Sequence, residues 1–154
     1  MSIPASALLP FIHRALDDMV RILETLGDER VNQRPGLPQA NSPYSIVTHC
    51  AGVTEYWLGH VLAKRPLNRD REAEFEAQGT VAQIRQVVRQ LQQQIEVDLP
   101  PIAGDQPVGE PVDLHGDLQE HTQGEVLLHW YRELTQHLGQ LELTRDILLH
   151  LPEQ

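Results

Sequence analysis

Four long stretches of this 154-residue chain repeat apolar side chains at steps of three and four residues, the period of an amphipathic α-helix. They cover residues 5–26, 43–63, 80–98 and 123–150. At 1.5 Å per residue, each helix would be about 30 Å long or longer. No segment shows the alternation and turn chemistry of a strand pair. Helices of matched length with one apolar face each predict an all-α fold, a four-helix bundle.

Proline, glycine and serine mark the ends of these helices. Gly27 ends the first helix, and Ser42 and Pro43 provide an N-cap and a first helical residue for the second. Pro100 and Pro101 stop the third helix. The connections between the helices are long, so the bundle need not follow a simple up-and-down order.

The connection from Ala63 to Gly79 is polar and contains a run of alternating charges at residues 69–72. We expect a solvated connection there, with a turn of helix around Phe75. The connection at residues 100–122 is rich in proline and glycine and carries His115 and His121. Taken singly, these histidines are expected to be structural or solvated.

Composition excludes several classes of partner. The length fits one domain over residues 1–154, and 40% apolar residues suffice for a core. The formal net charge is -10, and residues 98–154 hold 11 acidic but only two basic side chains (net -9), Arg132 and Arg145. Nucleic acids and anionic membranes require a basic surface, so we expect no nucleic-acid and no membrane partner.

Cys50 is the only cysteine, and its apolar neighbours predict a small buried side chain rather than a nucleophile. The N-terminus lacks the pattern of a signal peptide, and no apolar run reaches 18 residues. We therefore expect a cytoplasmic protein.

The chemistry in this sequence centres on Glu133 and His137, which are four residues apart and share one face of the last helix. Carboxylate and neutral imidazole can both bind a divalent metal. The best third ligand is His49, which shares an inward stripe with Val53 and Tyr56, where an unpaired imidazole would be costly. Such Glu/His pairs are common on helices, and a surface ion pair of Glu133 remains the alternative.

Three segments carry a resemblance to a known family. Residues 41–57 (NSPYSIVTHCAGVTEYW) and 133–140 (ELTQHLGQ) resemble the DinB-like (YfiT-like) metal-binding bundles. Residues 69–75 (RDREAEF) resemble the branch related to mycothiol-dependent maleylpyruvate isomerases. By position, the family's ligands fall on His49, Glu133 and His137. The commoner pattern has histidine where Glu133 stands, so this chain matches the His/Glu/His variant.

The resemblance implies an enzyme that activates a low-molecular-weight thiol at a divalent metal and adds it to an electrophile, as a transferase or isomerase. Zinc is the expected metal, and nickel or iron would also be compatible. The partners would be a small-molecule thiol, an electrophile and a second copy of the chain in a homodimer. His60 and His129 lie on the same two helices as the three candidate ligands. They are either core residues or residues that line the site. The alternative is a non-catalytic, stress-linked bundle in which the metal only links the second and fourth helices.

Overall fold

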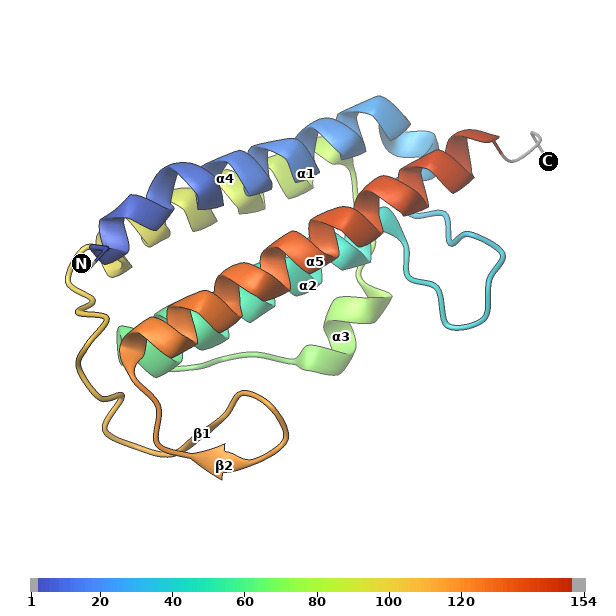
Figure 1. Cartoon of the computed structure of the whole chain (residues 1–154). Helices are drawn as coiled ribbons and strands as arrows, with labels where there is room; N and C mark the ends of the chain where they lie inside the picture. Colours follow the sequence, from blue (N-terminus) through green and yellow to red (C-terminus); the bar gives the residue numbers. More distant parts are fainter. Residues whose placement is uncertain (1–2, 151–154) are drawn as a thin grey trace.

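The computed structural model describes residues 3–150 and confirms the all-α bundle (Figure 1). Each long helix begins or ends within a few residues of its predicted boundary. The elements in chain order are η1 (Ala5–Leu8), α1 (Leu9–Arg30), α2 (Pro43–Thr54), η2 (Glu55–Leu62), α3 (Arg71–Glu76), α4 (Val81–Asp98), β1 (Val112–Asp113), β2 (Leu118–Gln119) and α5 (Gln123–His150).

The helix ends follow from local chemistry. The Ser42 hydroxyl accepts a hydrogen bond from the Ser45 amide at 3.2 Å, and Pro43 opens α2 as expected. Thr80 caps α4 in a reciprocal capping box with Gln83. Gly27 adopts a positive φ of 68°, which interrupts α1 and leaves only a short helical turn up to Arg30. The glycine therefore ends the straight part of the first helix.

The four long helices do not follow each other around the bundle. α1 packs between α4 and α5, and the α2–η2 segment packs against the same two helices on the opposite side. Figure 1 shows α1 and α5 running in one direction while α2 and α4 run in the other. Because consecutive α1 and α2 are not neighbours around the bundle, the long connections are needed to join them.

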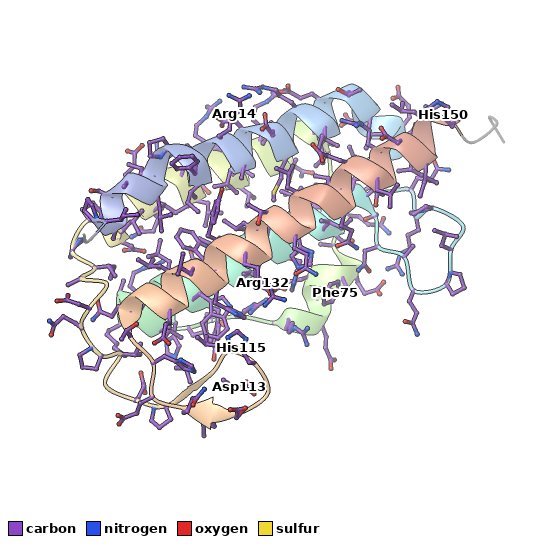
Figure 2. The ribbon with its side chains drawn as sticks, in the orientation of Figure 1. Arg14, Phe75, Asp113, His115, Arg132 and His150 are labelled. Carbon is purple, nitrogen blue, oxygen red and sulfur yellow. The ribbon has the colours of Figure 1, made fainter. Side chains whose placement is uncertain are left out.

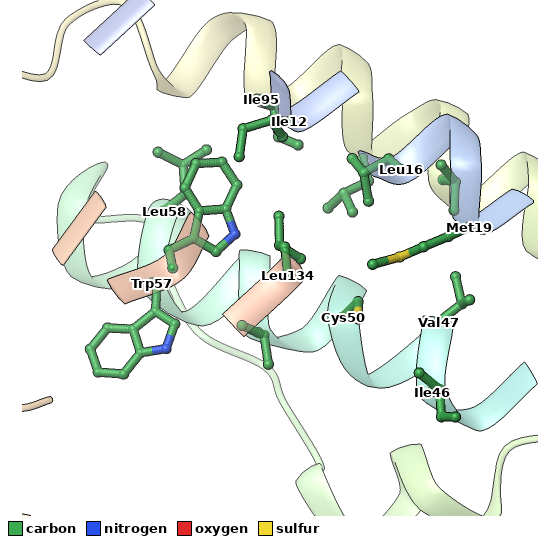
Figure 3. Packing of buried hydrophobic residues seen from close by; sticks show 14 of the residues in the cluster. Ile12, Leu16, Met19, Ile46, Val47, Cys50, Trp57, Leu58, Ile95 and Leu134 are labelled. Carbon is green, nitrogen blue, oxygen red and sulfur yellow. The ribbon is translucent and has the colours of Figure 1, made fainter. Parts of the chain in front are cut away.

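The core is built from the inward stripes. Trp130, Leu134 and Leu141 of α5 are fully buried, and they meet residues such as Leu16 and Met19 of α1 (Figure 3). The Trp130 indole donates to the Thr54 hydroxyl at 3.0 Å, so its polar atom is satisfied inside the core. Within residues 3–150, no helix is long and apolar enough to cross a membrane.

Cys50 lies in this core and has no exposed surface. Burial raises the pKa of its thiol far above the usual range, with a smaller contribution from the charge of Glu133. A thiol that stays protonated and inaccessible cannot act as a nucleophile. The prediction of a small buried side chain is confirmed.

One expectation about the connections was wrong. Residues 100–122 contain a two-stranded antiparallel ladder in which Val112 pairs with Gln119 and Asp113 with Leu118. Each strand is only two residues long, so no alternation of apolar and polar side chains can develop. The hairpin packs below α5 and carries His115 at its turn (Figure 2).

Candidate metal centre

His49 and His137 come together where α2 and α5 run antiparallel. Their imidazole rings meet edge to face, with centroids 4.8 Å apart and planes at 86°. The His49 side chain is 8% exposed, and that of His137 is 23% exposed at the edge of the bundle. Two histidines separated by 88 positions therefore share one site, as the apolar stripes predicted.

Glu133 lies one helical turn before His137 and faces it. Its Oε2 is 3.9 Å from His137 Nε2, and its other oxygen, Oε1, is 4.0 Å from Nε2 of His129. The carboxylate therefore lies between two imidazoles of α5. Its side chain is 26% exposed, so Glu133 lies at the mouth of the site and not on the outer surface.

His49 is held from the other side by residues of the connection from Ala63 to Gly79. Its Nδ1 is 2.8 Å from Glu74 Oε2, and Glu74 in turn receives two hydrogen bonds from Arg69, at 2.6 and 2.9 Å. Glu74 and Arg69 are 8% and 14% exposed. The prediction of a solvated connection was wrong here, because Glu74 of α3 and Arg69, just before α3, both point inward against α2. Phe75 of α3 completes the contact, with its ring centroid 4.8 Å from that of His49.

Gly52 explains how the Arg69–Glu74 pair reaches His49. A Cβ at this position would overlap the Glu74 carboxylate and would lie 2.9 Å from Arg69 Nε. The absent side chain thus creates the space for a buried ion pair on the surface of α2. The sequence motif contained this signal, a glycine three residues after the histidine, but neither Glu74 nor Arg69 was identified from it.

The hydrogen bonds of both histidines fix which nitrogen is free. An ionised carboxylate only accepts, so Nδ1 of His49 is the N–H donor to Glu74. Nδ1 of His137 is likewise 2.9 Å from Gln140 Oε1 and donates to it. Burial lowers the pKa of His49, and the hydrogen bond to Glu74 only partly opposes this, so the ring is favoured in its neutral form. Each Nε2 therefore carries a free lone pair.

This arrangement suits a metal ion in chemistry and nearly in distance. A metal-binding histidine almost always donates its other N–H to a carboxylate or carbonyl, as His49 and His137 both do. Two ligands of a tetrahedral zinc are about 3.4 Å apart, against 3.9 Å between Glu133 and His137. Among residues 3–150, no three such side chains form a ready metal-binding set as they stand. Glu133 or His137, which are both partly exposed, must therefore move before the three side chains can hold a metal.

A second group of histidines lies beyond Glu133. The His129 ring is 4.8 Å from that of Trp57 and 5.8 Å from that of His115, which is in turn 6.5 Å from His121. Buried atoms Nδ1 of His129 and Nε2 of His121 have no hydrogen-bond partner among the described residues. Burial lowers the pKa of His129. His129 therefore lines the site. This was one of the two alternatives for His129, the other being a core residue.

His60 does not line the site. It is exposed, and its Nδ1 is within 2.9 Å of the backbone oxygen of Arg65. The reason is that the second helix changes from α-helical to π-helical hydrogen bonding at Glu55, which widens the turn and shifts every later side chain. Trp57 is turned inward instead and is 8% exposed.

Comparison with known proteins identifies the family of this chain. A search of the curated proteins found no match. A family model described as mycothiol S-transferase matches residues 7–149, which include every helix of the bundle and both segments of the candidate site. The chain therefore belongs to the mycothiol S-transferase family.

Proposed function

We propose that the protein is a metal-dependent thiol S-transferase in which His49, Glu133 and His137 hold one divalent metal, with zinc first and nickel or iron as alternatives. One observation carries this proposal. The two histidine rings touch, each ring has an acceptor at Nδ1 and a free Nε2, and Nε2 of His137 lies 3.9 Å from the Glu133 carboxylate. Nothing in a purely structural core requires two imidazoles to be oriented in this way.

The family supports a small thiol, of the mycothiol type, as the first substrate. A free thiol with a pKa of about 8.5 is only a few per cent ionised at neutral pH. When bound, a divalent metal would supply the positive charge that favours the thiolate, a gain of more than about tenfold in the reactive form. The reaction forms a sulfur–carbon bond on an electrophile, whose leaving group or π electrons depart as the thiol proton is released.

The protein side chains have three tasks in this scheme. Glu74 and Arg69 hold the His49 ring, and Gln140 holds that of His137, so the ligands do not need to reorganise. Phe75 against His49 and Trp57 against His129 supply apolar surface on two sides of the site. Such surface limits the access of water and orients the second substrate, which raises the rate through proximity.

The test compares metal-loaded, chelated and Glu133→Ala protein, purified without a histidine tag, against small thiols including mycothiol and a model electrophile. We expect Glu133→Ala to lose most of its metal and its conjugation activity. Glu142→Ala is the matched control, because Glu142 is an exposed carboxylate on the same helix. Equal rates in all samples, with metal content confirmed, would instead indicate the non-catalytic metal-binding bundle.

We also propose that the protein is a homodimer. Phe11 of α1 and Val97 of α4 are 60% and 67% exposed, and they lie where His13 and Glu96 join the two helices at 3.4 Å. Exposed apolar side chains on two helices that pack together support a contact between copies. Sedimentation equilibrium at micromolar concentration should show a dimer that Phe11→Glu dissociates. A single 17.5 kDa species for the unaltered protein would contradict this.

A further inference from the structure

Arg132 is a cation without a partner beside the candidate metal centre. Residues 98–154 contain only two basic side chains, and the other, Arg145, is engaged by Asp146 at 2.7 and 2.8 Å. Within the described part of the chain, the Arg132 guanidinium makes no hydrogen bond or ion pair. It is exposed and directly precedes Glu133. A free guanidinium in the most acidic part of the protein is available to an external anion.

The second histidine group lies next to this cation. Figure 2 shows Arg132 on α5, on the side of the helix that faces the hairpin with His115 and Asp113. The charges of His115 and Arg132 both act on His129 and help to lower its pKa. Arg132, His115 and His129 therefore share one small region, between Glu133 and the turn of the hairpin.

His129 adds an independent sign that something binds in this region. Its side chain is 10% exposed, yet its buried Nδ1 has no partner among residues 3–150. Buried polar atoms in native proteins nearly always have a hydrogen-bond partner. An oxygen atom of a ligand would provide the partner that the protein itself does not.

Two carboxylates also lie near His129 and must be considered, because they would repel an anion. Asp113 Oδ1 already accepts a hydrogen bond from the Gly116 amide at 2.6 Å, which ties it to the hairpin turn. Glu133 would be neutralised by the metal under the proposed function. Glu133 and the bound thiolate together would balance the charge of a divalent metal, so Arg132 is the positive group left in the region to attract an anion.

We propose that Arg132, His129 and His115 form a subsite for a carboxylate group, and that the electrophile used by this protein carries that carboxylate close to its reactive carbon. The inference rests on the proposed function and specifies its second substrate. The planar fork of arginine matches both oxygens of a carboxylate, and imidazole N–H groups can donate to the same oxygens. Arg132 lies one helical turn after His129, and His129 Nε2 is 4.0 Å from Glu133 Oε1, so a carboxylate anchored there would bring the neighbouring carbon near the activated sulfur.

The reaction balances with the two substrates alone. In an aromatic substitution on a chloronitrobenzoate, the sulfur–carbon bond forms, chloride leaves with the bonding electrons, and the thiol proton passes to solvent. The carboxylate remains unchanged and acts only as a handle. Its replacement should therefore weaken recognition, while the change in intrinsic reactivity of the ring is given by the uncatalysed rate of each electrophile.

The experiment uses two electrophiles that differ only in the handle, 2-chloro-5-nitrobenzoate and 2-chloro-5-nitrobenzamide, with each rate divided by that of the uncatalysed reaction. For the full-length metal-loaded protein, we expect a higher kcat/KM with the acid. Arg132→Gln should lower the acid-to-amide ratio about tenfold or more, mainly through KM, as for other charged hydrogen bonds. Arg132→Lys should retain part of the ratio, and His115→Ala should lower it less.

Arg145→Gln is the matched control, because it removes the other, already paired, basic side chain of the segment. Its acid-to-amide ratio should be unchanged. Turnover of the amide reports the proposed function, whereas the ratio reports the subsite, so the two can fail separately. If neither electrophile reacts, binding of inert 4-nitrobenzoate against 4-nitrobenzamide decides the question. The proposal would be overturned if the unaltered protein and Arg132→Gln had the same acid-to-amide ratio, measured by rate or by binding.

Discussion

Two groups of histidines flank Glu133, and they differ in how their nitrogen atoms are satisfied. On one side, His49 and His137 each have a partner at Nδ1 and a free Nε2. On the other side, His129 and His121 each have a buried nitrogen with no partner within residues 3–150. Neighbouring side chains have thus fixed the orientation of the first pair and not of the second.

The pair His49 and His137 is therefore organised before a ligand binds, whereas the group around His129 is completed only by a ligand. A metal ligand gains affinity when its ring cannot rotate, because less freedom is lost on binding. An unpaired buried nitrogen costs about 1–3 kcal/mol until something binds to it. We therefore expect changes on the His49 side to act on the metal, and changes on the His129 side to act on the substrate.

The largest effect should come from removing a ligand on the organised side. His49→Ala should lower the affinity for zinc by more than about 100-fold, beyond what is usual for residues that only orient a ligand. His121→Ala removes a buried histidine of the other group and should keep a full equivalent of metal. Metal content after dialysis, measured by mass spectrometry, checks both. The comparison breaks if the two variants lose metal equally.

A smaller loss should follow from releasing the His49 ring while the ring itself is kept. Glu74→Gln removes the charge that accepts from Nδ1 and leaves Arg69 without its ion partner, so zinc affinity should fall about 10- to 100-fold. Glu76→Gln is the control, because that carboxylate is 78% exposed on the same short helix. Competition with a chromophoric chelator measures both. An unchanged affinity in Glu74→Gln would show that the buried pair only holds α3 in place.

Gln140 should matter less, because it is exposed and water can replace it as the acceptor from His137. Gln140→Ala should lower zinc affinity by about tenfold at most. The same competition assay applies, with Gln136→Ala as the control, since Gln136 is an exposed glutamine one turn earlier on α5. A loss as large as that of Glu74→Gln would mean that both histidines need equally firm support.

The smallest effect concerns acid sensitivity without metal. Burial lowers the pKa of both His49 and His129 in the folded protein. The unfolded chain then takes up more protons as the pH falls below about 6.5, so the stability these groups provide is present above that pH and is lost in acid. The free energy of unfolding of chelated protein should therefore fall from about pH 7.5 to about pH 5.5.

His129→Gln should flatten this pH profile slightly, because one depressed group no longer titrates. His150→Gln is the control, since His150 is exposed at the end of α5. Urea unfolding at each pH measures the effect. Parallel profiles for the unaltered protein and His129→Gln would show that His129 contributes nothing to acid sensitivity.

The sequence by itself determined the helices and the three candidate ligands. The apolar steps of three and four residues, Ser42 before Pro43, and the pair Glu133 and His137 all express rules that act within one or two helical turns. Such rules depend on near neighbours, so they can be recognised before the fold is known. The inward stripe likewise placed His49 on the side of its helix that meets α5.

Only the tertiary structure decided what surrounds those ligands. Glu74 reaches His49 across 25 positions because the connection from Ala63 to Gly79 folds back over Gly52, and no local pattern specifies the path of a connection. The π-helical turn at η2 turned His60 away from the site, although an α-helical period had left it as a candidate lining residue. Only the tertiary structure also showed that Arg132 has no partner within residues 3–150. Whether a charged side chain finds a partner depends on which surfaces the packed helices bring together.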